Sequence, residues 1–317
     1  MSGIICECNE AVKNLGVANC LDAFGRPQRI TFVPLYKEDG TENYIDTTTA
    51  ALDATYFNSL QYHTDTNSRF YPLPINLKNV EMPKADPVYQ EFDDGTKKFV
   101  RFGARSMTAL VPDIAPIYIG KINSKKCGKM GIYITSDTGN LGGTERTKGL
   151  LYPLALADNT LNTMWEFAGG STLEMGKIAM EFDTSVLDEQ FNWINNSDIS
   201  ISLTTQFKGK TDTNIAQLAA NRGATTFTVD IYTDYGSTKT KIPVEGLVTA
   251  DFALQNLTVP ATIVITSATE STTVPGRYVF VIPTATVTID LRLNLSTSTA
   301  AKPFADGTWN DVIIGLD

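Results

Sequence analysis

Residues 286–302, TVTIDLRLNLSTSTAAK, alternate between apolar and polar side chains along most of their length. The apolar positions are Val287, Ile289, Leu291, Leu293 and Leu295. Successive side chains of a strand point to opposite faces, so this pattern predicts a strand with one buried face and one solvent face.

Before residue 225 the pattern predicts further strands and one helix. Residues 29–40, RITFVPLYKEDG, predict a strand that ends at the Asp39-Gly40 turn. Leu52, Tyr56 and Leu60 recur at helical spacing after Asp46 and a run of threonines, which are suitable N-caps. We therefore expect one amphipathic helix over roughly residues 48–61, the best helix in the chain.

Residues 87–112 hold two extended runs on either side of the sequence DDGT, which is a strong hairpin signal. Further strands are expected within residues 130–143, 172–185 and 198–209, with a short helix or turn at 185–196.

The composition changes near residue 225, after which the chain is rich in Thr, Val and Ile and poor in charge. Six strand-like runs follow at short intervals and predict an immunoglobulin-like (Ig-like) β-sandwich over residues 225–300. Residues 1–224 then form the first domain. Residues 301–317 form a C-terminal extension, for which a return to the first domain stays open.

Composition limits the function. A chain of 317 residues with 42% hydrophobic residues can bury a sizeable core. A net charge of −9 argues against sequence-reading nucleic-acid binding, although an acidic surface lets DNA slide past without sticking. Neither an 18-residue apolar run nor a signal peptide is visible, so we expect no membrane segment and maturation in a cytoplasm.

Few residues suit catalysis or metal binding. His63 is the single histidine and lies in a polar stretch, so we interpret it as an exposed loop residue. Cys6, Cys8 and Cys20, with Cys127, invite a zinc hypothesis, but Cys-x-Cys is too tight for a tetrahedral ligand pair. Buried reduced thiols are the better interpretation.

Two glycine-rich segments and one acidic pair are better explained as turns. The sequence DTGNLGG, 137–143, lacks the register of a calcium loop, and AGGST, 168–172, lacks the helix and lysine of a phosphate loop. Asp93 and Asp94 are expected to cap the hairpin turn. We expect no enzyme, no catalytic, cofactor-binding or metal-binding residue, and no cofactor.

Four aromatic residues flank the predicted hairpin at strand spacing: Tyr89, Phe92, Phe99 and Phe102. They are candidates for stacking on sugars or bases, but core packing or a subunit interface is the favoured interpretation. They are our candidate interaction residues.

The order of segments resembles virion structural proteins of tailed phages that infect Bacteroidetes, the crAss-like phages especially, and among them tail-tube-like neck or ring proteins. The resemblance rests on GVANCLDAFGRPQRITFVP (16–34), the following helix, the hairpin segment (68–111), CGKMGIYITSDTGNLGG (127–143) and the late block (243–283). It implies a mainly β fold: a tail-tube-like β-sandwich or barrel with a flanking helix, and an Ig-like domain outside.

The resemblance also implies a function and partners. The chain is expected to form a homo-oligomeric ring of six or twelve copies, with twelve favoured, in the neck or tail of the virion. Neighbouring portal, neck or tail proteins and passing DNA, without sequence-specific contact, are the expected partners, and assembly is expected in the host cytoplasm. The alternative is a receptor- or glycan-binding head or tail fibre, or a surface adhesin.

Overall fold

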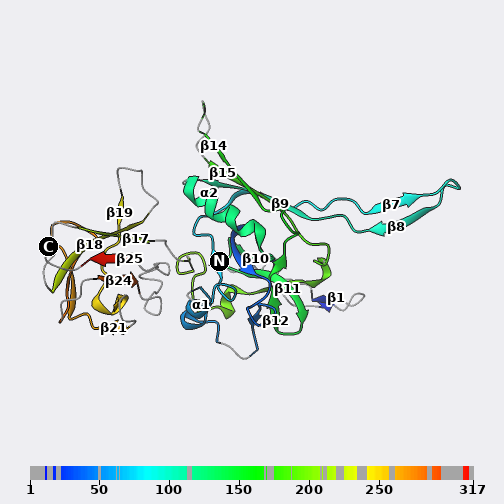
Figure 1. The fold of residues 1–317 in the computed structure, drawn as a ribbon. Coiled ribbons are helices and arrows are strands. Elements are labelled where there is room, and N and C mark those ends of the chain that lie inside the picture. The colour runs from blue at the N-terminus through cyan, green and yellow to red at the C-terminus, as the bar shows by residue number, and fades with distance from the viewer. Residues whose placement is uncertain are drawn as a thin grey trace. The chain divides into compact units, whose positions relative to one another are not determined.

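The computed structural model describes residues 11–12, 17–18, 23–48, 51–61, 63, 65–112, 116–167, 169, 175–186, 188–207, 209, 213–218, 225–233, 241–256, 261–283, 288–293 and 310–313. The chain is mainly β, with antiparallel sheets that include a half-barrel. It divides into two compact units, Met1–Lys208 and Gly209–Asp317 (Figure 1).

The first unit contains an eight-stranded antiparallel sheet. Six strands follow the order β4-β12-β11-β10-β3-β5, while β13 pairs with β10 and β16 with β11. The bounds are β3 (Pro27–Pro34), β4 (Ile45–Asp46), β5 (Tyr71–Pro72), β10 (Met130–Ser136), β11 (Leu141–Thr147), β12 (Leu150–Tyr152), β13 (Leu154–Ala155) and β16 (Phe191–Ile194).

A four-stranded sheet of the same unit has the order β14-β15-β9-β6. Its strands are β6 (Lys78–Glu81), β9 (Ser106–Pro112), β14 (Asn162–Glu166) and β15 (Met175–Glu181). Two separate two-stranded hairpins are β7 (Val88–Glu91) with β8 (Lys97–Arg101), and β1 (Ala11–Val12) with β2 (Val17–Ala18).

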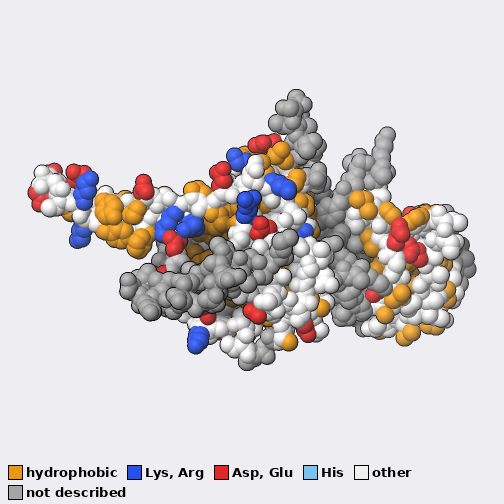
Figure 2. Space-filling view, turned by 180° about the vertical axis from the view of Figure 1, so that it is seen from behind, with side chains coloured by type: hydrophobic (Ala, Val, Ile, Leu, Met, Phe, Trp, Pro, Cys, Tyr) orange, Lys and Arg blue, Asp and Glu red, His pale blue; other side chains and the backbone are white. Residues whose placement is uncertain are grey.

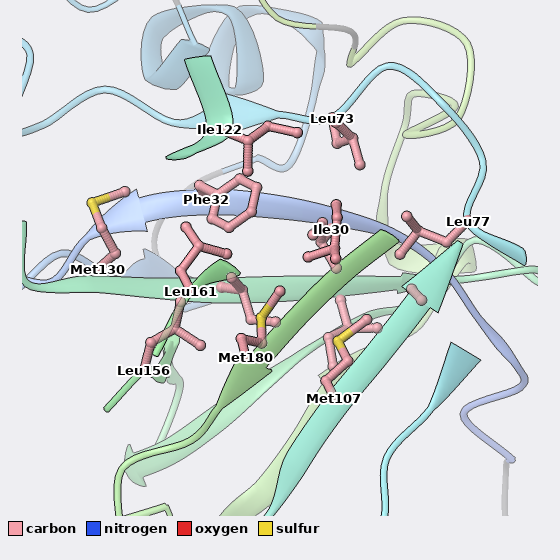
Figure 3. Packing of buried hydrophobic residues seen from close by; sticks show 14 of the residues in the cluster. Ile30, Phe32, Leu73, Leu77, Met107, Ile122, Met130, Leu156, Leu161 and Met180 are labelled. Carbon is pink, nitrogen blue, oxygen red and sulfur yellow. The ribbon is translucent and has the colours of Figure 1, made fainter. Parts of the chain in front are cut away.

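The main core of the first unit lies between these two larger sheets (Figure 3). Ile30 and Phe32 of β3 face Met107 of β9 and Met180 of β15, and Ile122 of helix α2 (Pro116–Asn123) closes the cluster. The hydrophobic effect holds the two sheets together, because their separation would return this apolar surface to water.

The opposite face of the large sheet is covered by helix α1 (Ala54–Gln61) and the segment 199–207. Phe57 of α1 contacts Phe207, with ring centroids 5.3 Å apart, and Tyr133 of β10 lies in the same cluster. Strand β10 is thus covered on both faces and every one of its residues is buried, which explains its nearly continuous apolar sequence.

Helix α1 is shorter than the 48–61 predicted from the sequence. Asp46 does not cap it, because its carboxylate accepts a 2.8 Å hydrogen bond from the backbone N–H of Thr48 in a local turn. The cap is Asp53, whose Oδ1 accepts the N–H of Tyr56 at 2.9 Å. Helix α2 is absent from our sequence prediction.

One further prediction in this unit was wrong, and another was confirmed in part. Residues 198–207, expected to be a strand, form turns and bends, although the alternating Ile199, Ile201 and Leu203 are buried as their pattern requires. Within 185–196, the expected short helix or turn is present as a 3-10 helix (Asp188–Gln190), whereas strand β16, which follows it, was not predicted.

The second unit consists of two antiparallel sheets that share one core. One has the order β17-β18-β23-β22 with β19 paired to β18, and the other β21-β20-β24-β25. The bounds are β17 (Thr213–Gln217), β18 (Thr226–Thr233), β19 (Ile242–Pro243), β20 (Phe252–Asn256), β21 (Ala261–Ile263), β22 (Ser267–Glu270), β23 (Arg277–Val281), β24 (Thr288–Leu293) and β25 (Asn310–Ile313).

Stacked aromatic rings form the centre of this second core. The rings of Phe227 and Phe280 lie parallel, with centroids 4.7 Å apart, and Phe252 meets Phe280 edge-on at 4.8 Å. Leu291 of β24, one of the alternating residues of the first sequence pattern, is fully buried among them. The alternation therefore predicts strand β24 correctly over its described residues.

The contacts place the division between the units at 208/209, ahead of the predicted boundary at 224/225, because β17 pairs with β18. At the other end, β25 pairs with β24. The four described residues of the C-terminal extension therefore belong to the second unit.

Candidate interaction arm

Residues 83–105 form a hairpin of the first unit that we call the arm (Figure 1). Its strands β7 and β8 are joined by the predicted turn, in which the N–H of Phe92 donates to the carbonyl of Thr96 at 2.9 Å. Gly95 has a φ of 81°, which a side chain would disfavour. The hairpin prediction is confirmed.

Asp94 holds the turn closed. Its Oδ1 accepts hydrogen bonds from the hydroxyl of Thr96 at 2.6 Å and from the N–H of Thr96 at 2.9 Å. These bonds favour the charged carboxylate and lower the pKa of Asp94. The prediction that the Asp93-Asp94 pair caps a turn is confirmed for Asp94.

A β-bulge gathers three aromatic rings on one face of the arm. Tyr89 pairs with Phe99, but Val88 pairs with Arg101, so Val100 is an extra residue on β8. Strict alternation would place Phe99 and Phe102 on opposite faces. The bulge instead brings their ring centroids within 4.8 Å, and Tyr89 lies edge-on to Phe99 at 6.0 Å.

The rings of the arm are exposed to solvent. Tyr89 and Phe102 are each 54% exposed, Phe99 is 45% and Phe92 44% exposed. Figure 2 shows hydrophobic side chains gathered along the arm, with charged side chains at its tip. The core-packing interpretation of these four residues was therefore wrong, and they form an apolar surface on a thin two-stranded ribbon.

One carboxylate of the first unit contacts both strands at the base of the arm. Asp188 accepts from Lys84 Nζ at 2.5 Å and from Arg105 Nη2 at 2.7 Å. The hydrogen bond from Lys84, with a contribution from Arg105, lowers the pKa of Asp188. Arg105 also donates to the carbonyl of Met82 at 3.2 Å. No sequence pattern indicated this anchor, because its residues are far apart in the chain.

The two strands of the arm meet closely at Gly103. A Cβ atom on Gly103 would lie 1.8 Å from the carbonyl oxygen of Ala85, a distance that no side chain can adopt. Glycine therefore lets the two strands approach at this point. Next to Gly103, on the side of the base, the N–H of Ala85 donates to the carbonyl of Ala104 at 2.9 Å.

Charge is divided between the two halves of the arm. Beyond the base, residues 86–94 of the outgoing half carry only acidic charged residues, which are Asp86, Glu91, Asp93 and Asp94. Residues 97–104 of the returning half carry only basic ones, which are Lys97, Lys98 and Arg101. One pair connects the halves, with Lys97 Nζ 3.4 Å from Glu91 Oε2, and both side chains are about 60% exposed.

Strand β14 presents a second exposed apolar group that sequence reasoning missed. Phe167 is 78% and Met164 47% exposed, and the ring of Trp165 lies 4.5 Å from that of Phe167. Residues 162–166 alternate too weakly for the sequence to separate an edge strand from a central one. Strand β14 is an edge of its sheet among the described strands.

A polar cleft of about 430 Å³ lies in the first unit beside Glu145, Asn192 and Trp193. Both carboxylate oxygens of Glu145 accept hydrogen bonds from neighbouring groups of the chain. Glu145 Oε1 accepts the N–H of Gly149 at 2.8 Å, and Oε2 accepts from the side-chain amide of Asn192. These two bonds, led by that from Gly149, lower the pKa of Glu145. The carboxylate therefore holds the β11–β12 turn, and we assign no chemistry to the cleft.

The remaining sequence candidates are not brought together. His63 is exposed, and its Nδ1 accepts the N–H of Asp65 at 3.1 Å. Asp137 Oδ1 accepts the N–H of Arg26 at 2.9 Å in a turn at Gly139. Cys127 is exposed and free. Cys6, Cys8 and Cys20, and most of 168–172, lie outside the described residues.

Neither a metal site within the described residues nor a known family is indicated. Among the described residues, no three His, Cys, Asp or Glu side chains are grouped as metal ligands. No helix in that part of the chain combines the length and hydrophobicity needed to cross a bilayer. Comparison with models of protein families and with curated proteins finds no match to the sequence.

Proposed function

We propose that this chain is a structural virion protein of a tailed phage, which assembles with copies of itself into a ring of the neck or tail. The observation that carries the proposal is the arm. Its aromatic face is exposed in the single chain, whereas apolar surface of this kind on a projecting element is typical of a protein interface.

The fold of each unit supports a specific role for that unit in the ring. The first unit, with two sheets around one core and α1 against the large sheet, serves as the tail-tube-like β domain with a flanking helix. The second unit, with two antiparallel sheets around one core, serves as an Ig-like module on the outside of the ring. The resemblance in segment order points the same way.

The ring has six or twelve copies, with twelve favoured, and encloses the DNA channel. A heterologous contact repeated at a fixed rotation closes into such a ring. With a net charge of −9 on each copy, DNA passes without sequence-specific contact. Portal, neck and tail proteins are the neighbours above and below, and assembly takes place in the host cytoplasm.

The test is the mass of the purified full chain over a range of concentrations, by mass photometry and negative-stain electron microscopy. We expect annular particles of six or twelve copies. A chain that stays monomeric at high concentration would overturn the proposal. Gold labelling of virions through the second unit is expected to mark the neck or tail.

A matched pair of variants connects assembly to the arm. Tyr89→Ser, Phe99→Ser and Phe102→Ser together remove the aromatic face, and we expect loss of the annular particles. The control carries Val248→Ser, Val264→Ser and Val279→Ser, which are exposed apolar residues of the second unit. We expect the control to assemble as the unaltered chain does.

The second candidate is a glycan-binding fibre or adhesin, which the exposed rings of the arm also favour, because aromatic faces stack on sugars. It predicts a trimer, or a monomer, that binds host surface polysaccharide and loses this binding in the triple Ser variant. A ring that binds no polysaccharide excludes it.

A further inference from the structure

Both edges of the arm are open. In the described part of the chain, β7 pairs only with β8 and β8 only with β7. Each strand therefore presents a row of backbone N–H and C=O groups on its outer edge, which is a template for pairing with another strand. A second copy of this chain offers the same two edges.

The two edges carry opposite charge. The β7 edge belongs to the acidic half, with Asp86 and Glu91, and the β8 edge to the basic half, with Lys97, Lys98 and Arg101. An edge of one sign is suited to an edge of the other sign and disfavours its own kind, because like charges directly opposite each other destabilise strand pairs.

We infer that the β8 edge of one arm pairs with the β7 edge of the arm of the next copy, so that the arms of the ring form one continuous antiparallel sheet. The inference rests on the proposed function, for which it names the joint between subunits. Copies related by rotation about the ring axis point their arms the same way. A returning β8 then lies beside an outgoing β7, which is the antiparallel arrangement.

The charges select this pairing over the symmetric ones. A two-fold contact of β8 with β8 would place three basic residues against three, and a contact of β7 with β7 would place acids against acids. If neighbouring arms are related by rotation and their tips lie at the same height along the ring axis, Lys97 of one arm lies beside Glu91 of the partner subunit. Glu91 and Lys97 already face each other within the hairpin, so Lys97 then has a glutamate on both sides.

The same arrangement explains the aromatic face. Tyr89, Phe99 and Phe102 share one face of each arm, so neighbouring arms in one sheet align their rings into a continuous apolar band. Closure of the ring removes every open edge. A single arm keeps both edges open and its aromatic face in water.

The test exchanges charge between the edges of the full chain. An acidic-arm variant carries Lys97→Glu, Lys98→Glu and Arg101→Glu, and a basic-arm variant carries Asp86→Lys and Glu91→Lys. An exchanged variant carries all five substitutions. A control variant carries Lys126→Glu, Lys129→Glu and Lys148→Glu, exposed residues of the first unit outside the arm, and changes the net charge as the acidic-arm variant does.

We expect the acidic-arm and basic-arm variants, each alone, to need an about tenfold higher concentration for half-assembly, as measured by mass photometry. An equimolar mixture of the two is expected to assemble as the unaltered chain does, because opposite edges then alternate around the ring. The exchanged variant is expected to assemble alone, and so is the control variant.

Several results would overturn the edge pairing. These are unchanged assembly of the two single-sign variants, absence of rescue in their mixture, or failure of the exchanged variant while amide exchange shows its arm intact. In each case the unaltered chain still forms rings, so the proposed function survives. If the unaltered chain forms no particle, the proposed function itself fails.

Discussion

The substitution Asp188→Asn tests whether the ion pairs of Asp188 keep the base of the arm closed. Asparagine keeps the size of the side chain but removes the charge that receives Lys84 and Arg105. We expect the base of the arm to open more often, with the strands of the body unchanged. The effect is local because Asp188 contacts the body through its own 3-10 turn and the arm through two side chains.

The structure sets the size of the effect. The side chain of Asp188 is 49% exposed, and those of Lys84 and Arg105 are 37% and 31% exposed, so solvent screens both pairs. Surface pairs contribute about 0.2–1 kcal/mol each, and we therefore expect a loss of about 1 kcal/mol for the two together. Such a loss corresponds to about fivefold faster opening of the base.

Hydrogen–deuterium exchange of the backbone amides measures this opening. The reporters are the N–H groups of Ala85 and Ser106, which donate to Ala104 at 2.9 Å and Pro83 at 3.0 Å across the base. The matched control is Glu91→Gln, which breaks the more exposed pair with Lys97 near the tip. Equal exchange at the base in the Asp188 variant and in this control would refute the reasoning.

The pH dependence gives the same test a second signature. The pKa of Asp188 is lowered in the folded chain, so its contribution is fully present above the ordinary carboxyl range and is lost as pH falls through the lowered pKa. Exchange at the base, corrected for the intrinsic effect of pH, is expected to accelerate below about pH 4. The Asp188→Asn variant is expected to lack this step.

Three further predictions concern other parts of the chain. Gly103→Ala forces the strands of the arm apart at Ala85, so limited proteolysis is expected to cleave the arm faster in this variant. The control is Gly95→Asn, because asparagine tolerates the positive φ of position 95. Tyr278→Phe leaves the carbonyl of Val244 and the N–H of Leu247 without their hydroxyl partner, and calorimetry is expected to show a loss of about 1–3 kcal/mol in the free energy of unfolding. The control Tyr232→Phe keeps the ring contact with Lys241 and is expected to lose less than about 0.5 kcal/mol. Burial raises the pKa of Tyr278, so the stability of the second unit is expected to fall as the pH rises above about 10. This loss is expected to be smaller in Tyr278→Phe, and an equal loss in both chains would contradict the prediction.

Sequence patterns predicted strands well where alternation reflects one buried face, or where a turn sequence joins two paired strands. Strand β24 and the hairpin of the arm are confirmed over their described residues, because alternation and the Asp-Gly turn each have a direct structural cause. Segment 198–207 shows the limit of the method. Its alternating residues are buried as expected, but the N–H of Ser200 donates to Leu52 and that of Gln206 to Ser202, so no ladder forms. Alternation reports burial and not pairing.

The candidate interaction residues were found from spacing, while their arrangement was not. No pattern in KKFVRF shows that Val100 is a bulge, because the bulge depends on the register with β7. The sequence favoured a core or an interface for the four aromatics, and only the exposure of the arm separates the two. The anchor at Asp188 was equally hidden, since it joins residues that are 104 and 83 positions apart.

The acidic and basic residues around the tip have a further consequence for the single chain. Flat ribbons with wet aromatic rings are prone to stack into fibres, and clustered charges beside such a ribbon act as gatekeepers. Asp93, Asp94, Lys97 and Lys98 occupy this position. The arm thus carries its own protection against aggregation, and we expect a chain in which these four residues are replaced by neutral ones to precipitate more readily.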